Sequence, residues 1–317
     1  MTRILANDGI HPTGQAKLEA AGYEVVTTKV AQEDLPAELP HYAAICVRSA
    51  TKVRQDLIDQ CPNLKAIGRG GVGLDNIDVD YARSKGIQVV NTPAASSRAV
   101  AELAFAHALS LTRFLHRANK EMRSEEADFK KLKKAYAGGV QLQGRTLGVI
   151  GLGRIGREAA RIGLGLGMRV IGADPFVDHA DVQLNIQGLD QQPSVRVASL
   201  PLKDLLAQAD VVTLHVPSQD GKPVIGADEM KSVKQGAILI NTARGGLIDE
   251  QALLDALASG QVAAAGLDVF TNEPTPDARL LSHERISISP HIGAATGEAQ
   301  ELIGLELADQ LIDILGS

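Results

Sequence analysis

Tryptophan is absent from this 317-residue chain, and cysteine occurs only twice, at Cys46 and Cys61. Two cysteines at this spacing form neither a disulfide framework nor a metal-binding motif, so we expect buried, reduced thiols and no metal site. No apolar run approaches the length of a membrane-spanning helix. The N-terminus also lacks the charged and apolar pattern of a signal peptide. These absences predict a cytoplasmic protein that does not insert into membranes.

Positive charge is not in excess either, because 32 lysine and arginine residues stand against 38 aspartate and glutamate residues, for a formal net charge of −6. This balance disfavours general binding to nucleic acid or to an anionic membrane surface. The hydrophobic content of 44% and the charged content of 22% are typical of a globular protein. A chain of this length can form two domains, each with its own core.

Short apolar runs alternate with helical patterns along almost the whole chain. In the first third we expect strands at 3–6, 23–27, 43–47, 66–68 and 88–91, with helices at 12–21, 54–60 and 79–85. A second series of strands is expected at 146–151, 169–174, 211–216, 237–241, 263–268 and 286–289. Single long helices are expected at 100–122 and 298–315. The alternation predicts an α/β protein with doubly wound parallel sheets, and the second series has the strand count of a dinucleotide-binding fold.

The strongest local signal follows the first strand of the second series, where the sequence reads Gly151-x-Gly153-x-x-Gly156 and a helical pattern begins. Such glycines allow a tight turn, a close approach of a pyrophosphate to the backbone, and close helix packing. A glycine cluster alone also fits a purely structural turn. Here Asp174 ends the next strand, 18 positions after Gly156, where an acid would bind the adenosine ribose and repel a 2′-phosphate. The sequence therefore predicts an NAD site rather than an NADP site.

Three further strand ends carry the side chains that oxidation of an alcohol by NAD requires. His291 can act as acid and base near neutral pH, and Glu273 can orient its ring and stabilise the imidazolium. Arg244 can clamp a substrate carboxylate with two parallel hydrogen bonds. Each residue alone also fits a structural role, as a surface cation, a solvated acid or a core histidine. The carboxyl ends of parallel strands meet at one edge of a sheet, so together the three predict a catalytic site.

The motifs VIGLGRIGRE, LHVP, INTARGGLIDE, AGLDVFTNEP and SPHIGAAT occur in an order and spacing that resemble the D-isomer-specific 2-hydroxyacid dehydrogenase family. The resemblance runs over nearly the whole chain and implies that Arg244, Glu273 and His291 are the catalytic set. It also extends the expected cofactor contacts beyond the glycine turn and Asp174. These further residues are Arg154, Ile155, His215, Val216, Pro217, Thr242, Ala243, Asp268 and Gly293.

The N-terminal half, with CVRSATKV and IGRGGVGLDNIDV, is most similar to family members that act on D-3-phosphoglycerate. That similarity implies a phosphorylated hydroxy acid as substrate, bound by Arg48, Ser49, Gly70, Gly71 and Val72. Further cations are available for its phosphate at Lys52, Arg69 and the lysines between 130 and 134, although a lysine run is more often a solvated face. Glyoxylate, hydroxypyruvate or D-lactate are alternative substrates. A non-catalytic NAD-sensing scaffold is a third reading.

The resemblance further implies two domains. A flavodoxin-like substrate-binding lid is expected at 1–97 and 293–317, with a Rossmann NAD domain inserted at 98–292. The family implies closure of the lid before hydride transfer, and a homodimer formed largely by helices such as 100–122. Because the sequence ends directly after the last helix, we expect no appended regulatory domain and no feedback by serine.

Overall fold

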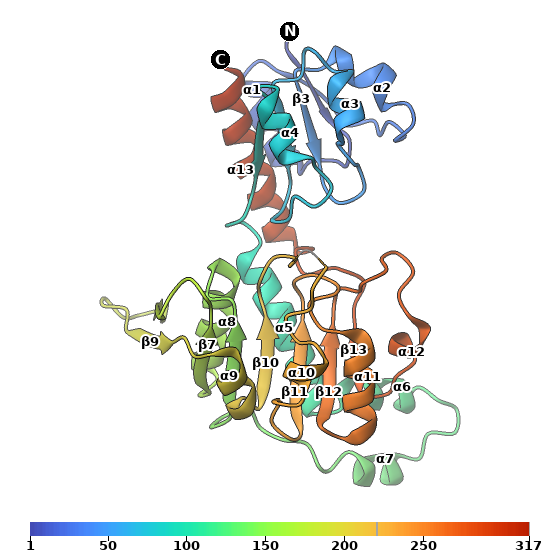
Figure 1. Ribbon diagram of the computed structural model, residues 1–317, viewed down its shortest axis with the longest axis vertical. Helices are drawn as coiled ribbons and strands as arrows, with labels where there is room; N and C mark the ends of the chain where they lie inside the picture. Colours follow the sequence, from blue (N-terminus) through green and yellow to red (C-terminus); the bar gives the residue numbers. More distant parts are fainter. Residues whose placement is uncertain (220, 317) are drawn as a thin grey trace. The chain divides into compact units, whose positions relative to one another are not determined.

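The computed structural model describes residues 1–219 and 221–316, which fall into two compact units. Unit 1 combines Met1–Ala99 with the C-terminal segment that begins at Ala294, and unit 2 is Val100–Gly293 (Figure 1). Both units are built on parallel sheets with helices between successive strands, so the predicted α/β class is confirmed. The roles assigned to the two parts, substrate binding and cofactor binding, stay predictions.

Unit 1 contains a five-stranded parallel sheet with the order β2-β1-β3-β4-β5. This is the flavodoxin-like order, in which the chain reverses direction beside the first strand. All five strands lie within a residue or two of the predicted ranges. They are β1 (Arg3–Ala6), β2 (Glu24–Val26), β3 (Ala44–Val47), β4 (Ala66–Arg69) and β5 (Gln88–Asn91).

Helices cover both faces of this sheet, which the strands' apolar side chains require. The helices are α1 (Pro12–Ala20), α2 (Leu35–Glu38), the 3₁₀ turn η1 (Leu39–His41), α3 (Gln55–Asp59), α4 (Val79–Ser84) and α13 (Gly297–Leu315). The last helix, α13, crosses α1 where Gly14 meets Gly304, and a Cβ on Gly14 would lie 2.4 Å from the Gly304 carbonyl oxygen. Leu307 of α13 packs over Gly68 of β4. The C-terminal helix thus completes the core of unit 1.

Unit 2 contains a six-stranded parallel sheet with the order β13-β12-β11-β10-β6-β7. The predicted six strands are confirmed as β6 (Thr146–Ile150), β7 (Arg169–Ala173), β10 (Val211–Leu214), β11 (Ala237–Asn241), β12 (Val262–Leu267) and β13 (Ile286–Ile288). Beyond this sheet, Gly172 of β7 forms an isolated parallel bridge with Ser199. The central strands β10 and β11 are buried along their whole length, as expected for a sheet covered on both faces.

The remaining helices of unit 2 connect and cover these strands. They are α5 (Ser97–Thr112), which begins in unit 1, α6 (Leu115–Met122), α7 (Phe129–Ala135), α8 (Arg154–Gly165), α9 (Leu202–Gln208), α10 (Ala227–Met230), α11 (Glu250–Ser259) and α12 (Ala278–Leu281). Across residues 1–219 and 221–316, no helix is both long and apolar enough to cross a membrane. The same residues contain no cluster of metal-binding side chains.

The single helix predicted at 100–122 is wrong, because the chain breaks between α5 and α6. Phe114 adopts a left-handed backbone conformation, with φ of 56°, and its ring lies 5.8 Å from that of Tyr136. The Thr112 hydroxyl donates back to the carbonyl of Ala108, a bond that competes with helix continuation. The apolar pattern persists through the break, so periodicity alone did not reveal it.

No strand was expected between 175 and 210, but residues 179–198 form a β-hairpin, in which the segment at 185–197 supplies the connecting loop and most of the second strand. Strands β8 (His179–Gln183) and β9 (Ser194–Ala198) pair antiparallel and form a separate two-stranded sheet beside β7 (Figure 1). Ala180 and Val182 face inward while their neighbours along β8 are exposed. The lysine-rich segment after α6 likewise contains the short helix α7, whose lysines are exposed.

Candidate active site

The glycine turn after β6 requires glycine at two positions for steric reasons. Gly151 has a φ of 91°, and a Cβ there would lie 2.6 Å from the carbonyl oxygen of His215. A Cβ on Gly156 would lie 1.8 Å from the Gly151 carbonyl oxygen. Gly153 differs, because nothing lies within 4 Å of the position that its Cβ would take. The turn is therefore closed on the protein side and open at Gly153, as the approach of a pyrophosphate requires.

Helix α8 begins at Arg154, directly after this opening, and Gly153 supplies no side-chain cap. The first amides of a helix lack partners within the helix and carry the positive end of its dipole. Arg154 is exposed and Ile155 is half-buried at this end. A negatively charged group at Gly153 would meet these amides, which is the usual way in which a Rossmann fold binds a dinucleotide.

Asp174 lies at the end of β7, beside the glycine turn. Its carboxylate accepts hydrogen bonds from the backbone N–H of Leu152, at 2.8 Å, and of Phe176, at 2.9 Å. The two bonds fix the carboxylate next to the turn while leaving it partly exposed. Each carboxylate oxygen retains a further lone pair, so Asp174 can still accept from the hydroxyls of a ribose.

Two buried polar atoms near the ends of β10 and β11 fit a bound dinucleotide. The Nδ1 of His215 and the Oγ1 of Thr242 are buried and have no hydrogen-bond partner among the described residues. Val216 packs against the glycine turn, since a Cβ on Gly151 would lie 2.7 Å from its Cγ1. Buried polar atoms in native proteins almost always have partners. The open turn, Asp174 and these two atoms together fit NAD.

His215 also provides a prediction about pH. Burial lowers the pKa of His215 from the ordinary 6.5 to about 3. The unfolded chain takes up a proton here as the pH falls through 6.5, whereas the folded chain does not, so this residue's contribution to stability is full above pH 6.5 and decreases below it. We expect the His215 ring to stay neutral between about pH 8 and pH 5 in an NMR titration, with the signal assigned through His215→Asn. A titration midpoint near the ordinary pKa would contradict this assignment.

Arg244 lies in the loop that follows β11, and the side chain of Asn241 shapes this loop. The Asn241 side chain donates to the carbonyl of Arg244, at 2.8 Å, and accepts from the N–H of Ala243, at 3.1 Å. Gly245 packs directly on the segment after β12, where a Cβ would lie 2.0 Å from the carbonyl oxygen of Phe270. The loop of Arg244 is thereby held against the segment that leads to Glu273.

Glu273 and His291 are paired. The Oε2 of Glu273 lies 2.7 Å from Nδ1 of His291, and its Oε1 accepts from the N–H of Phe270 at 3.0 Å. The second contact fixes the carboxylate, so that the imidazole is oriented through its Nδ1. The His291 side chain is 44% exposed, so the ring is open to a substrate. Its other nitrogen, Nε2, is the one left for chemistry.

Asp268 fixes the backbone of the loop that carries His291. It is fully buried, and its carboxylate accepts from the N–H groups of Ile292 and Gly293 and from the hydroxyl of Ser289. Its carbonyl oxygen accepts from the N–H of His291 at 2.8 Å. The carboxylate of Asp268 thus binds this loop, and its expected role as a cofactor contact stays a prediction.

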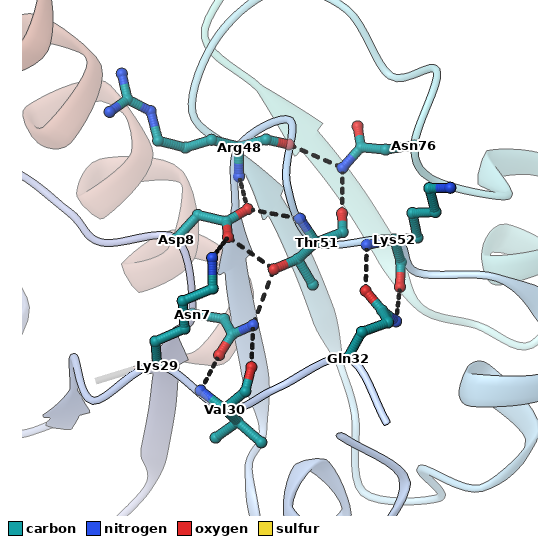
Figure 2. A network of polar contacts seen from close by, with 9 residues as sticks. All are labelled: Asn7, Asp8, Lys29, Val30, Gln32, Arg48, Thr51, Lys52 and Asn76. Atoms are coloured by element: carbon teal, nitrogen blue, oxygen red, sulfur yellow. Dashed lines mark hydrogen bonds and ion pairs between the residues drawn. The ribbon is translucent and has the colours of Figure 1, made fainter. Parts of the chain in front are cut away.

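In unit 1 a buried acid, Asp8, organises the loop that contains Arg48 (Figure 2). Its carboxylate accepts from the N–H groups of Arg48, at 2.7 Å, and Thr51, at 3.0 Å. The side chain of Asn76 donates to the carbonyls of both residues. The Arg48 side chain points away from this network (Figure 2). It donates to the side chain of Gln300 in α13.

The predicted substrate residues of unit 1 come together beside this loop. Gly70 lies between the loop and α13, since a Cβ there would lie 3.9 Å from Cγ of Arg48 and 3.2 Å from Ile303. Gly71 has a φ of 137°, and the Arg69 guanidinium occupies the space where its Cβ would lie. Val72 is half-buried and Ser49 is exposed. Two arginines thus flank one glycine turn within unit 1.

Unit 2 brings together the loops that carry Arg244, Glu273 and His291, and it also holds all the predicted cofactor residues. The latter are Gly151, Gly153, Arg154, Ile155, Gly156, Asp174, His215, Val216, Pro217, Thr242, Ala243, Asp268 and Gly293. Sequence reasoning did not identify Asp8, Asn76, His107, Ser287 or Ser289. Asn76 and Ser289 lie within the motifs IGRGGVGLDNIDV and SPHIGAAT, but their roles, like those of the other three residues, depend on contacts with distant parts of the chain.

Comparison with known proteins places the chain in a family. The model for the D-isomer specific 2-hydroxyacid dehydrogenase NAD binding domain matches residues 105–293. The chain is 40% identical to a Methanocaldococcus jannaschii protein named D-3-phosphoglycerate dehydrogenase, over 99% of this chain and 58% of that protein. It is 39% identical to hydroxypyruvate reductase of Thermotoga maritima, over 99% of this chain and 98% of that protein.

Among solved structures, a glyoxylate reductase from Paecilomyes thermophila matches with a TM-score of 0.82 at 30% identity, over 98% of this chain and 94% of that one. The chain spans little more than half the length of the Methanocaldococcus protein, at 58%, but nearly all of the Thermotoga protein, at 98%. The family model covers the glycine turn, Asp174, Arg244, Glu273 and His291. This chain therefore belongs to the D-isomer specific 2-hydroxyacid dehydrogenase family.

Proposed function

We propose that this chain is an NAD-dependent dehydrogenase that oxidises a D-2-hydroxy acid to the corresponding 2-oxo acid. The observation that carries the proposal is the contact of 2.7 Å between Glu273 and Nδ1 of the exposed His291 ring. This pair lies in the unit that holds the glycine turn and Asp174. An imidazole oriented by a carboxylate, beside a site for NAD, supplies what alcohol oxidation needs.

The proton and the hydride leave the substrate by different routes. NAD, held by the glycine turn and Asp174, would supply the hydride acceptor. With its Nδ1–H directed at Glu273, the neutral His291 ring has an unprotonated Nε2 that can accept the hydroxyl proton. Glu273 then stabilises the imidazolium that forms. Arg244 binds the substrate carboxylate and withdraws electron density from the developing carbonyl group.

We infer further that the substrate is D-3-phosphoglycerate and the product 3-phosphohydroxypyruvate. Arg48 and Arg69 lie on either side of the Gly70–Gly71 turn, and a phosphorylated acid needs cations beyond Arg244. The Methanocaldococcus relative carries the name of this activity. The Thermotoga relative is named for hydroxypyruvate, so an unphosphorylated substrate is the alternative.

A panel of D-2-hydroxy acids tests the choice of substrate. We expect kcat/KM for D-3-phosphoglycerate to exceed that for D-glycerate and D-lactate. Arg48→Ala is expected to lower kcat/KM for D-3-phosphoglycerate by about 10- to 100-fold, because a charge-assisted hydrogen bond is lost, and to change the value for D-glycerate much less. The exposed Arg83 of α4 provides the control variant, Arg83→Ala. Equal losses on both substrates, or a preference for D-glycerate, would contradict the phosphorylated substrate.

We also infer a homodimer and a cytoplasmic location. Several large apolar side chains on α5 to α7 are exposed, which supports burial of this region against a second copy. They are Leu109, Leu115, Met122 and Phe129. Sedimentation equilibrium of the purified protein measures the oligomeric state.

The inferred cytoplasmic location is supported by the two cysteines. Cys46 and Cys61 are both buried and free, which fits a reducing compartment.

A further inference from the structure

Behind the loop of His291 lies a buried chain of hydrogen bonds that starts on α5. His107 of α5 is only 4% exposed, and its two ring nitrogens contact Ser287 within β13 and Ser289 just after it. Nδ1 lies 2.8 Å from Oγ of Ser287, and Nε2 lies 2.9 Å from Oγ of Ser289. Ser289 in turn donates to Oδ1 of Asp268 at 2.6 Å. The chain therefore runs from His107 through Ser289 to Asp268.

The donors and acceptors of this chain fix where its protons lie. The Asp268 carboxylate already receives two backbone N–H groups, so it accepts the hydroxyl proton of Ser289. The Ser289 oxygen must then accept from Nε2–H of His107, because its own proton is committed. Burial lowers the pKa of His107 and so favours a neutral ring, in which Nδ1 carries no proton and accepts from Ser287. The ring is thus a neutral imidazole in a single tautomer.

The surroundings of His107 support a neutral, fixed ring. Its pKa is lowered, chiefly by burial, although the charge of Asp268 acts in the opposite direction. Gly266 of β12 leaves the space that the ring needs, since a Cβ there would lie 2.7 Å from Cβ of His107. A leucine at position 107 would fill a similar space but could not donate a hydrogen bond. The His107 ring is thus closely packed, and its Nε2–H is a defined hydrogen-bond donor.

The far end of this chain of hydrogen bonds is the backbone of His291, the proposed acid and base. His291 adopts φ of 54°, a left-handed conformation that non-glycine residues seldom adopt. Three successive N–H groups, those of 291, 292 and 293, donate to Asp268. Asp268 holds the N–H of His291 through its backbone carbonyl and the next two N–H groups through its carboxylate. The orientation of this carboxylate therefore helps to fix the loop from which the His291 ring extends. Ser289 is the side chain that braces Oδ1 of Asp268, and His107 braces Ser289.

We propose that His107 is a positioning residue for His291, acting through Ser289 and Asp268 across the core of unit 2. The proposal rests on the proposed function, in which His291 moves the substrate proton. His107 itself touches neither substrate nor cofactor. Its hydrogen bond keeps Ser289 directed at Asp268, and thereby keeps the His291 loop in the one conformation that pairs the ring with Glu273.

Four single variants and one double variant, each made in the whole 317-residue chain, test the relay. His107→Leu removes the hydrogen bond to Ser289, and Ser289→Ala removes the hydroxyl that donates to Asp268. His107→Gln keeps an N–H donor in the place of Nε2. Ser287→Ala is the matched control, because it removes only the bond to Nδ1 of His107. We expect kcat to fall about tenfold in His107→Leu and Ser289→Ala, with NAD affinity and KM changed less than threefold. His107→Gln should recover most of this loss, and Ser287→Ala should stay close to the unchanged protein. The double variant His107→Leu/Ser289→Ala should be no worse than either single one.

A second readout does not depend on turnover. In the unchanged protein and in Ser287→Ala, the Nδ1–H proton of His291 should give one NMR signal typical of a hydrogen bond to a carboxylate. In His107→Leu and Ser289→Ala that signal should shift or broaden, while circular dichroism stays unchanged. An unaltered His291 signal in both variants, or kcat losses that multiply in the double variant, would overturn the relay. Absence of activity on every hydroxy acid, with the NMR changes present, would refute the proposed function and leave the relay standing.

Discussion

His291→Asn is expected to lower kcat by about 10²- to 10⁴-fold and to leave NAD affinity unchanged. Loss of a positioned general acid or base has this order of effect. Asparagine is the informative replacement, because residue 291 has φ of 54° and asparagine tolerates this left-handed conformation. The loop held by Asp268 should therefore keep its shape, and the loss will report on the imidazole. Steady-state kinetics with calorimetric titration of NAD measure the two quantities.

Two further variants are needed to interpret the result for His291→Asn. His179→Asn alters an exposed histidine of the β8–β9 hairpin and should leave kcat unchanged. Glu273→Gln retains an acceptor for the Phe270 N–H but removes the charge that stabilises the imidazolium, so its loss of kcat should be smaller than that of His291→Asn. A decrease of less than about fivefold in His291→Asn would contradict a role for this ring in proton transfer.

Arg244→Lys is expected to lower kcat/KM by about 10²- to 10³-fold although the positive charge is kept. Lysine offers a point charge in place of a planar fork, so two parallel hydrogen bonds to the substrate carboxylate are lost, and a preorganised donor at the reacting centre has an effect of this order. NAD affinity should not change, because the glycine turn and Asp174 are untouched. Arg279→Lys, at an exposed ion pair with Asp277, is the control.

Activity of Arg244→Lys within a few-fold of the unchanged protein would show that the carboxylate is bound elsewhere. A loss of NAD affinity equal to the loss in kcat/KM would instead place Arg244 in the cofactor site. The hydrogen bonds of Asn241 hold the Arg244 loop through backbone atoms, so the substitution leaves its anchor in place.

The sheets of both units could be predicted because their strands are continuous apolar runs separated by helical patterns. Strands β1, β5 and β11 were predicted without error, and the other parallel strands to within two residues at either end. Local signals were enough, since a buried parallel strand must be apolar along its length. The single helix predicted across α5 and α6 was wrong because no local signal marks the break. The left-handed residue Phe114 does not interrupt the spacing of apolar residues.

The hairpin of β8 and β9 was missed because only Ala180, Val182 and Val197 among its residues face the core. Such a short alternation is not distinct from that of a polar loop. The catalytic candidates Arg244, Glu273 and His291 were identified because each lies just beyond a predicted strand. His107 could not be found in this way, because its partners Ser287 and Ser289 are 180 and 182 positions away.

The most direct test of hydride transfer uses D-3-phosphoglycerate and D-glycerate that carry deuterium at C2. The site formed by NAD, His291 and Arg244 predicts that the label moves from C2 to the nicotinamide ring of the NADH produced, and that none appears in water. The L-enantiomers should yield no NADH. Release of the label to solvent, or NAD binding with no NADH formed from any D-2-hydroxy acid, would contradict the account.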